Sequence, residues 1–318
     1  MTQAQVAVLG ECMLEVSLAT SASDLMAAKV PANLSYGGDV LNTAVYLSRL
    51  SCAVDFVSAL GDDEMSSWLL AQWRQEGVGC DLIECMPKQS PGLYLISTDD
   101  EGERSFSYWR EQSPARKMFD DPAKARILFD RLRDYPWLYF TGISLAILSD
   151  EGRALLLGFL DEYRAGGGKV AFDSNFRPRL WADKLSAQAV FNQVYAKTDL
   201  AMLTLDDEIL LFGEGSVEAH AERLQRSGIK ELVLKQGPDG CLIIKDGQSE
   251  RVAAQMVVPV DTTSAGDSFN AGYLSQLVAG RSSVEAAQVA HQLAGLVIQH
   301  RGAIVGKSVT EALVTSLN

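Results

Sequence analysis

Short apolar runs alternate with amphipathic segments along nearly the whole chain. Runs with the length and composition of buried strands occupy residues 6–10, 54–60, 137–142, 169–175, 200–204 and 231–235. Between them, apolar residues recur at helical spacing in 39–50, 66–75, 151–165 and 219–226. This alternation predicts an α/β fold, with a mostly parallel central sheet and helices on both of its faces.

Two segments depart from this pattern because their polar and apolar residues alternate one by one. Residues 91–110 form two such stretches around DDEGE at 99–103, which predicts an antiparallel hairpin. A hairpin that stands apart from a strand–helix core is a natural lid. Residues 241–254 predict a second hairpin, at the edge of the large sheet. The chain shows no internal repeat and no linker, so we expect a single domain over residues 1–318.

Composition and charge argue against several classes of function. Of the 318 residues 47% are hydrophobic, no apolar run approaches the ~20 residues of a membrane span, and we expect no signal peptide. A net charge of −13 without a basic tract argues against nucleic acid as a partner. The five cysteines lack CxxC spacing and the three histidines lack ligand spacing. We therefore expect reduced thiols in a cytoplasmic protein, and neither a zinc site nor a histidine-based triad.

The segment from Asp261 to Leu274, DTTSAGDSFNAGYL, carries the clearest chemical signal. Its small residues let backbone N–H groups converge on one place, and the helix that follows adds a partial positive charge there. Asp267 sits at the rim of this anion cradle, where a carboxylate could take a proton from a substrate hydroxyl as a phosphate arrives. An ordinary N-capping aspartate before a packed helix explains the same residues about equally well.

Two further groups have the chemistry of sugar contacts. Gly37 and Gly38 allow a ligand to approach the backbone, and Asp39 or Asn42 can bond sugar hydroxyls, although a turn with an N-cap is the simpler explanation. Tyr108 and Arg110 end the first hairpin and would share one face of a strand, with Tyr94 on the neighbouring strand. A ring, a hydroxyl and a guanidinium suit a carboxylated sugar; a cross-strand aromatic pair with a solvated arginine is the alternative.

Three loops follow predicted strands at the edge where open α/β sheets bind ligands. In 173–178, DSNFRP, Arg177 could bind a carboxylate or a phosphate. The loop 234–240, LKQGPDG, is either a nucleotide-binding loop or a tight turn. In 204–208, TLDDE, the carboxylates could hold Mg²⁺ or simply stabilise a helix dipole.

Taken together, these motifs resemble the ribokinase-like (PfkB) family of sugar and nucleoside kinases over nearly the whole chain. The family's early Gly-Gly with Asn and its late small-residue loop with Asp are both present and in order, at 37–42 and 264–267. Within the family, the segments GECMLEVS, YGGDVLNTAVYLSRL, FTGISLAILS and FDSNFRPRLW are most similar to kinases of 2-keto-3-deoxygluconate. The resemblance implies a ribokinase-type core and a small β lid built from segments near 11–36 and 91–112.

The resemblance also implies roles for individual residues. Asp267 would be the catalytic base for the 6-hydroxyl of the sugar acid. The backbone of Ser264, Ala265, Gly266 and Asp267 would stabilise the phosphoryl group transferred from MgATP. The sugar acid would be bound by Gly37, Gly38, Asn42, Tyr94, Tyr108, Arg110 and Arg177. ATP would contact Asn175, Lys235, Gly237, Asp239, Gly240, Ser264 and Gly266. Mg²⁺ would be held through water by Asp207 or Glu208, and lid strands would pair two subunits into a homodimer.

The chain departs from the family pattern at two positions. Ser264 replaces the first glycine of GAGD, and a left-handed conformation there would cost a serine roughly 1–2 kcal/mol. We expect Ser264 to adopt an ordinary conformation instead. The metal motif Asn-x-x-Glu reads Thr204-x-x-Asp207, which weakens the assignment of Asp207 and makes Glu208 a rival.

The resulting expectation is ATP-dependent phosphorylation of 2-keto-3-deoxygluconate to its 6-phosphate, in sugar-acid catabolism. A kinase for fructose or another neutral sugar is the alternative. It is disfavoured because a neutral ligand would leave the positive charges of Arg110 and Arg177 without a counter-ion in a closed site. A sugar sensor that retains the fold without catalysis is disfavoured by the intact Asp267. A Rossmann dehydrogenase is disfavoured because VAVLGECM lacks the GxGxxG fingerprint.

Overall fold

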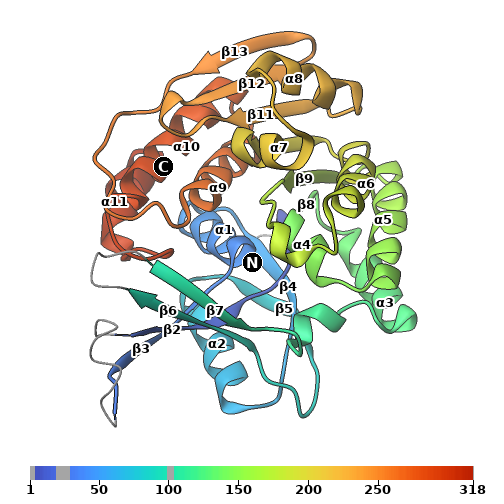
Figure 1. Cartoon of the computed structure of the whole chain (residues 1–318), viewed down its shortest axis with the longest axis vertical. Coiled ribbons are helices and arrows are strands. Elements are labelled where there is room, and N and C mark those ends of the chain that lie inside the picture. The colour runs from blue at the N-terminus through green and yellow to red at the C-terminus, as the bar shows by residue number, and fades with distance from the viewer. Residues whose placement is uncertain (1–3, 19–28, 99–103, 318) are drawn as a thin grey trace.

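The computed structural model describes residues 4–18, 29–98 and 104–317, and these build an α/β fold with two sheets (Figure 1). The large sheet has the order β13-β12-β11-β10-β9-β8-β1-β4-β5 and is parallel from β11 to β5. Its strands are β1 (Val6–Leu9), β4 (Val54–Leu60), β5 (Gly79–Cys85), β8 (Trp137–Thr141), β9 (Lys169–Asp173), β10 (Leu200–Thr204), β11 (Glu231–Lys235), β12 (Cys241–Lys245) and β13 (Gln248–Val252). The predicted hairpin over 241–254 is confirmed as the antiparallel edge formed by β12 and β13.

Helices cover both faces of this sheet, as predicted (Figure 1). One face packs against α3 (Pro122–Leu132), α4 (Gly142–Ile147), α5 (Asp150–Ala165), α6 (Lys184–Tyr195), α7 (Leu205–Phe212) and α8 (Val217–Arg226). The other packs against α1 (Asp39–Arg49), α2 (Glu64–Gln75), α9 (Ala265–Val278), α10 (Ser283–Val297) and α11 (Lys307–Leu317).

The two hydrophobic cores explain why the strands read as continuous apolar runs. Along β1, Ala7 and Leu9 enter one core, whereas Val6 and Val8 enter the other. Successive side chains of a strand point to opposite faces, so a strand buried on both faces needs apolar residues at every position. None of the helices that the structure describes is long and apolar enough to cross a membrane.

The small sheet is a separate layer beside the large one and has the order β3-β2-β6-β7 (Figure 1). Its strands are β2 (Met13–Leu18), β3 (Ala32–Gly37), β6 (Gly92–Thr98) and β7 (Arg104–Trp109). The antiparallel pairing of β6 with β7 confirms the hairpin predicted over 91–110; its predicted turn at 99–103 lies outside the described residues. One face of the sheet packs on α2 through Tyr36, whose ring centroid lies 5.7 Å from that of Trp68.

Candidate active site

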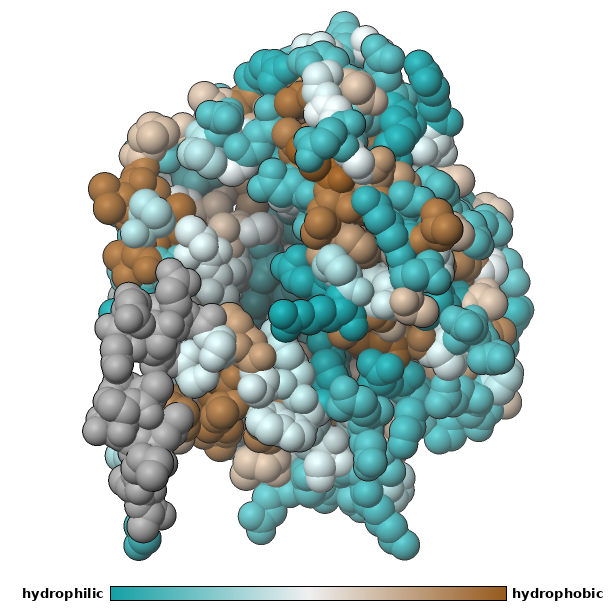
Figure 2. All heavy atoms as spheres, in the orientation of Figure 1, coloured by the Kyte–Doolittle hydropathy of each residue, from teal (hydrophilic) through white to brown (hydrophobic). Residues whose placement is uncertain are grey.

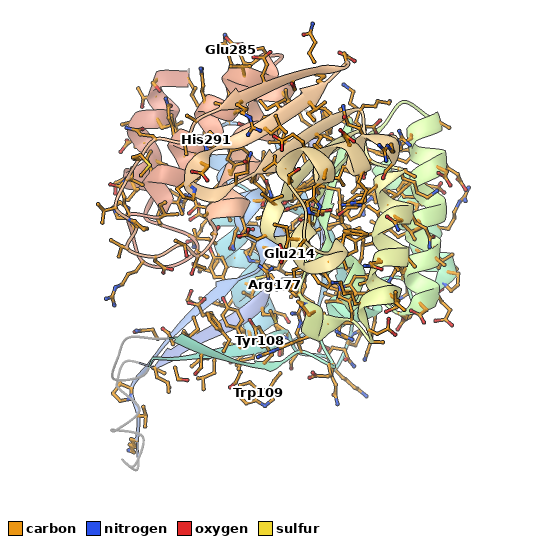
Figure 3. All side chains as sticks on the ribbon, turned by 45° about the horizontal axis from the view of Figure 1, so that its top comes forward. Tyr108, Trp109, Arg177, Glu214, Glu285 and His291 are labelled. Carbon is orange, nitrogen blue, oxygen red and sulfur yellow. The ribbon has the colours of Figure 1, made fainter. Side chains whose placement is uncertain are left out.

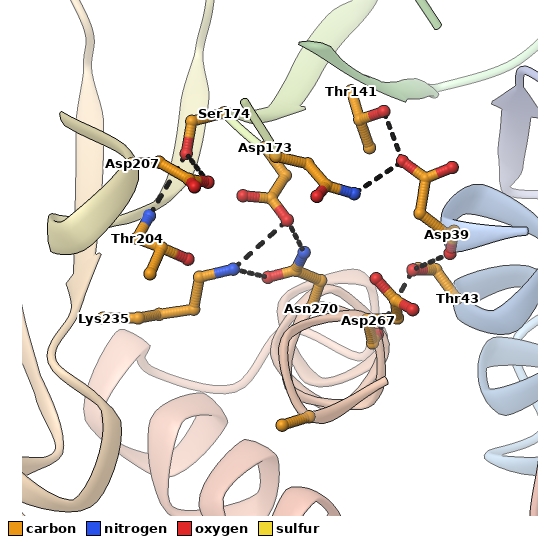
Figure 4. Close-up of polar contacts among 12 residues, drawn as sticks. Asp39, Thr43, Thr141, Asp173, Ser174, Thr204, Asp207, Lys235, Asp267 and Asn270 are labelled. Carbon is orange, nitrogen blue, oxygen red and sulfur yellow. Dashed lines mark hydrogen bonds and ion pairs between the residues drawn. The ribbon is translucent and has the colours of Figure 1, made fainter. Parts of the chain in front are cut away.

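Polar side chains from distant parts of the chain converge at the carboxyl edge of the large sheet (Figure 4). Thr141 ends β8 and Asp173 ends β9. Beside them, α1 begins with Asp39 and the first turn of α9 carries Asp267. Figure 2 shows the surface hollowed at this level, between the small sheet and the rest of the molecule. This is the edge at which open α/β sheets bind their ligands.

Asp267 is fixed by residues of α1, the helix against which α9 packs. Its Oδ2 accepts a hydrogen bond from Nδ2 of Asn42 at 2.9 Å, and its main-chain oxygen accepts one from Oγ1 of Thr43 at 3.2 Å. Oδ1 of Asn42 is buried without a partner among the described residues. The structure therefore gives Asn42, a predicted sugar contact, a direct part in orienting the carboxylate of Asp267.

The surroundings of Asp267 make its carboxyl group unusually basic. Burial raises the pKa of Asp267 to about 7, and the negative charges of Asp39 and Asp173 add to the rise. The hydrogen bond from Asn42 favours the ionised form and opposes both effects. A carboxylate that titrates near neutral pH is suited to general base catalysis, because it binds a proton strongly and yet is substantially ionised.

Asp39 is a second, largely buried carboxylate in the same place. Its Oδ2 accepts two hydrogen bonds, from Oγ1 of Thr141 at 2.6 Å and from Nδ2 of Asn175 at 2.7 Å. Burial raises the pKa of Asp39, and these two bonds oppose the rise. Asn175 has a φ of 30°, in the region that asparagine tolerates better than most residues. This residue, predicted to contact ATP, thus links the loop after β9 to the start of α1.

Lys235 lies in a buried hydrogen-bond network that joins β11, β9 and α9. Its Nζ is 3.0 Å from Oδ1 of Asn270 and 3.2 Å from Oδ2 of Asp173 (Figure 4). Nδ2 of Asn270 in turn donates to that Asp173 oxygen at 2.7 Å and to the hydroxyl of Tyr139 at 3.0 Å. A Cβ added to Gly266 would lie 3.5 Å from Nζ of Lys235. The ammonium group therefore sits beside the first turn of α9, where a phosphate is expected.

The turn into α9 differs from the prediction at Ser264. This residue has φ 64° and ψ 15°, so the expectation of an ordinary conformation is wrong. The chain has to reverse abruptly there, and the N–H of Ala265 already bonds to the oxygen of Thr262 at 3.2 Å. The N–H groups of Gly266 and Asp267 have no acceptor within the described part of the chain. The turn thus exposes two donors at a helix N-terminus, at a cost of roughly 1–2 kcal/mol for a left-handed serine.

The register of the small sheet places the predicted sugar contacts on one face. Tyr94 is paired with Tyr108 on one side and with Glu15 on the other, and cross-strand partners point the same way. The hydroxyl of Tyr94 donates to the carboxylate of Glu15, and the two tyrosine ring centroids lie 5.9 Å apart. A Cβ at Gly37 would lie 2.5 Å from the Tyr94 hydroxyl, so a larger residue there would displace the tip of that side chain. This face is turned away from α2, whereas Trp109 points away from the large sheet (Figure 3).

Arg110 forms a buried ion pair with Glu11, the residue that follows the β1 strand and its glycine. Their side chains are 8% and 2% exposed, respectively. The argument that a neutral sugar would leave the charge of Arg110 without a counter-ion is therefore wrong, because Glu11 already neutralises that charge. The guanidinium carbon lies 6.0 Å from the ring centroid of Tyr108, which confirms that these residues share a face. A Cβ at Gly38 would lie 2.4 Å from the main-chain oxygen of Glu11, so this glycine is needed for close packing.

Arg177 is the more accessible of the two predicted carboxylate-binding arginines, with a side chain that is 55% exposed. Its Nη1 donates to the main-chain oxygen of Phe176 at 3.0 Å and lies 3.7 Å from Oδ1 of Asp207. The contact with Asp207 is long and open to solvent, so it weakly neutralises the guanidinium. Arg177 can therefore exchange this partner for an anionic ligand at low cost.

Asp207 fits a water-mediated Mg²⁺ site, whereas Glu208 does not. Oδ2 of Asp207 accepts bonds from Oγ of Ser174 and the N–H of Phe176, both at 3.1 Å. One such carboxylate suits Mg²⁺, which keeps several waters and takes phosphate oxygens as ligands. Both oxygens of Glu208 are already used, by the hydroxyl of Tyr195 and by Arg223, and its side chain is fully buried. The prediction of Glu208 as a metal ligand is therefore wrong.

The loop after β11 is a tight turn that leads into the edge hairpin. Residues 237–239 form one short 3₁₀ turn, and the N–H of Gln236 donates to the oxygen of Gly240 at 2.8 Å. Gly240 has φ 91°, and a Cβ there would lie 2.1 Å from the oxygen of Val252. Gly237 and Asp239 are exposed at the same edge as the site. Their contact with ATP stays a prediction.

Comparison with known proteins assigns the family. The pfkB family of carbohydrate kinases matches residues 3–310. The chain belongs to this family. It is 44% identical to the 2-dehydro-3-deoxygluconokinase of Dickeya dadantii, over 96% of this chain and 98% of that protein. It is 42% identical to the enzyme of the same name from Escherichia coli K12, over 97% and 99%.

Solved structures confirm the ribokinase-like fold. The structure of a PfkB protein from Polaromonas sp. JS666 superposes with a TM-score of 0.83, at 26% identity, over 98% of this chain and all of that one. A ribokinase II from Escherichia coli, solved in complex with ATP and Mg²⁺, gives the same TM-score at 21% identity. These matches cover the large sheet and the small sheet together.

Several residues of the site lie outside the set predicted from the sequence. Glu11, Thr141 and Asn270 lie within the motif segments, but the sequence gives them no role of their own because they act through partners that are distant in the sequence. Asn270 could have been suspected, since it lies one helical turn after Gly266 on the same helix. Asp39 was recognised only as one of two candidates for a sugar hydroxyl, and its position beside Asp267 comes from the fold.

Replacing Asp267 with Asn should stabilise the protein at high pH more than at low pH. The folded-state pKa of about 7 exceeds the ordinary value of 3.8, so the native state retains a proton that the unfolded state releases between these values. The wild-type carboxyl therefore costs stability progressively as pH rises from about 4 to 7, and Asn removes that cost. Thermal unfolding should show a higher Tm for Asp267→Asn at pH 8 and nearly equal Tm values at pH 4. A difference that is the same at both pH values would contradict the raised pKa.

Proposed function

We propose that this carbohydrate kinase transfers the γ-phosphoryl group of ATP to the 6-hydroxyl of 2-keto-3-deoxygluconate, giving 2-keto-3-deoxy-6-phosphogluconate. The observation that carries the substrate assignment is full-length similarity, at 38–44% identity, to relatives named 2-dehydro-3-deoxygluconokinase. Two relatives named as fructokinases are 29% identical, and the matches cover 76% and 78% of this chain. The site geometry supports the reaction class, because a basic carboxylate lies in the first turn of a helix with free N–H donors.

Asp267 is the proposed base. Asn42 holds its carboxylate in place, and burial gives it the affinity to accept the proton of the 6-hydroxyl as the oxygen attacks phosphorus. The N–H groups of Gly266 and Asp267, with the partial positive charge of the α9 N-terminus, stabilise the charge that develops on the phosphoryl oxygens. Lys235 adds a full positive charge beside the same turn.

The nucleotide is expected over the carboxyl ends of β9, β10 and β11. Asn175, Lys235, Gly237, Asp239 and Gly240 all lie at this edge, and Asp207 is the carboxylate placed to hold Mg²⁺ through water. When bound, Mg²⁺ would neutralise charge on the nucleotide phosphates. Oδ1 of Asp173 is buried here without a partner among the described residues, an arrangement that a bound ligand or water would complete.

The sugar acid is proposed to lie against the cleft-facing side of the small sheet. Gly37, Tyr94 and Tyr108 share that side, and Arg177 faces the site from the loop after β9. Because Glu11 neutralises Arg110, the substrate carboxylate is expected to depend most on Arg177, with Arg110 as a donor that remains paired. A kinase for neutral sugars such as fructose remains the alternative.

The proposed setting is a homodimer in the cytoplasm. The small sheet exposes several large apolar or aromatic side chains, each at least 40% accessible: Leu34, Phe106, Tyr108 and Trp109. Leu34 and Trp109 lie on the face opposite Tyr108 and the site, and a second copy of the lid would cover that face.

Substrate identity can be tested by coupled ADP release with MgATP. The purified protein would be assayed with 2-keto-3-deoxygluconate, 2-keto-3-deoxygalactonate, gluconate, fructose and ribose. We expect kcat/KM for the first to exceed that for fructose by ~10³ or more, because a site built around charged partners rejects an analogue that lacks them. If fructose or ribose is preferred, the assignment as a keto-acid kinase fails, while the family assignment stands.

Arg177→Ala tests which arginine reads the carboxylate. Loss of a charge-assisted contact should raise KM for the keto acid about 10- to 100-fold, with little effect on KM for a neutral sugar. Arg179→Ala is the matched control, since Arg179 is exposed two residues further along the same loop. An unchanged KM for the keto acid in Arg177→Ala would remove this residue from the substrate site.

A further inference from the structure

Asp39 stands out as a charged group at the centre of the site that the proposed reaction does not itself use. It comes from the first residue of α1, and its Oδ2 is held at 2.6 Å by Thr141 and at 2.7 Å by Asn175. These partners come from the end of β8 and from the loop after β9. The carboxylate is thus anchored to the end of β8 and to the loop after the neighbouring strand β9; Figure 4 shows its bond to Thr141.

The same residue is connected to Asp267 through Thr43. Oγ1 of Thr43 lies 3.2 Å from the main-chain oxygen of Asp39 and 3.2 Å from that of Asp267. The first turn of α1 and the first turn of α9 are therefore held against each other, and the two carboxylates lie in the same partly buried region. Two negative charges in such a place raise each other's affinity for protons.

Other charged and titratable groups lie near Asp267, near Asp39 or beside the first turn of α9. They are Asp173 from β9, Arg177 from the loop that follows, Lys235 from β11, Tyr139 from β8 and Tyr46 from α1. The tyrosines stay neutral near pH 7, since their pKa values are raised by burial. Asp173 is already compensated by Lys235 and by the amide of Asn270. Asp39 accepts hydrogen bonds from Thr141 and Asn175 but forms no ion pair with any described residue. Its negative charge is therefore less neutralised than that of Asp173.

We propose that Asp39 is a positioning residue that acts through Asp267, as a fixed negative charge that sets the pH at which Asp267 becomes a base. This inference rests on the proposed function, in which Asp267 takes the proton of the sugar hydroxyl. It assigns Asp39 a task different from binding a sugar hydroxyl. It also gives Thr141 and Asn175 a shared purpose, which is to hold that charge at a constant distance.

The test compares the pH dependence of kcat/KM in the wild type, Asp39→Asn and Asp150→Asn. The amide introduced by Asp39→Asn keeps an acceptor oxygen for Thr141 and Asn175 but carries no charge. The acid limb of this variant should move to lower pH by about one unit, because removal of a nearby like charge favours the ionised form of Asp267. Asp150 is the matched control, since it is also the first residue of a helix and its side chain is 90% exposed. Its variant should reproduce the wild-type limb.

An acid limb unchanged from the wild type in an active Asp39→Asn enzyme would overturn the inference. If that variant folds but turns over too slowly, the titration of the Asp267 carboxyl carbon can be followed by NMR in ¹³C-labelled protein, with Asp267→Asn used to assign the signal. A lower midpoint in Asp39→Asn supports the inference, and an equal midpoint refutes it. Failure of the proposed function would look different: Asp267→Asn would then turn over normally, whatever Asp39 does.

Discussion

The site depends on shielding the carboxylate of Asp267 from much of the solvent while leaving it able to ionise. Partial burial of a carboxylate is costly, and the chain limits this cost with a donor from Asn42 and with the N-terminus of α9. The packing of α1 against α9 supplies both the burial and the donor, and Thr43 joins the two helices at that point. The packing of these two helices on the large sheet therefore brings two helix N-termini to one edge of that sheet.

The same edge balances its charges largely within the chain. Lys235 is matched by Asp173, Arg110 by Glu11, and Arg177 more loosely by Asp207. Internal pairing lets a protein with a net charge of −13 hold cations where anionic ligands are expected. It also means that the number of arginines near the site does not by itself identify the substrate. The pairing with the weakest hold, that of Arg177, is the one a ligand can most easily replace.

The sequence predicted the features that depend on local pattern. Burial of β1 and its neighbours on both faces produces continuous apolar runs, and these runs predicted the strands of the large sheet. One-by-one alternation of polar and apolar residues in 91–110 predicted the hairpin. The small residues before Asp267 also predicted the helix start at which the N–H groups of Gly266 and Asp267 lack an acceptor among the described residues. Contacts between distant residues could not be predicted in this way: Asp39 meets Thr141 and Asn175 across 102 and 136 positions, and Glu11 meets Arg110 across 99. The prediction of Glu208 as a metal ligand also depended on the fold, because neighbouring residues of a helix point to different sides. Asp207 faces the site, whereas Glu208 bonds to Tyr195 in the interior.

Asp267 is proposed as the base for phosphoryl transfer, and Asp267→Asn removes the group that would take the proton. Asn keeps the shape and the bond to Asn42, so the binding of 2-keto-3-deoxygluconate measured by calorimetry should remain close to that of the wild type. In coupled ADP release with MgATP, kcat should fall by ~10²–10⁴, the usual contribution of a positioned general base. Turnover within a few-fold of the wild type, with sugar binding intact, would show that Asp267 is not the base.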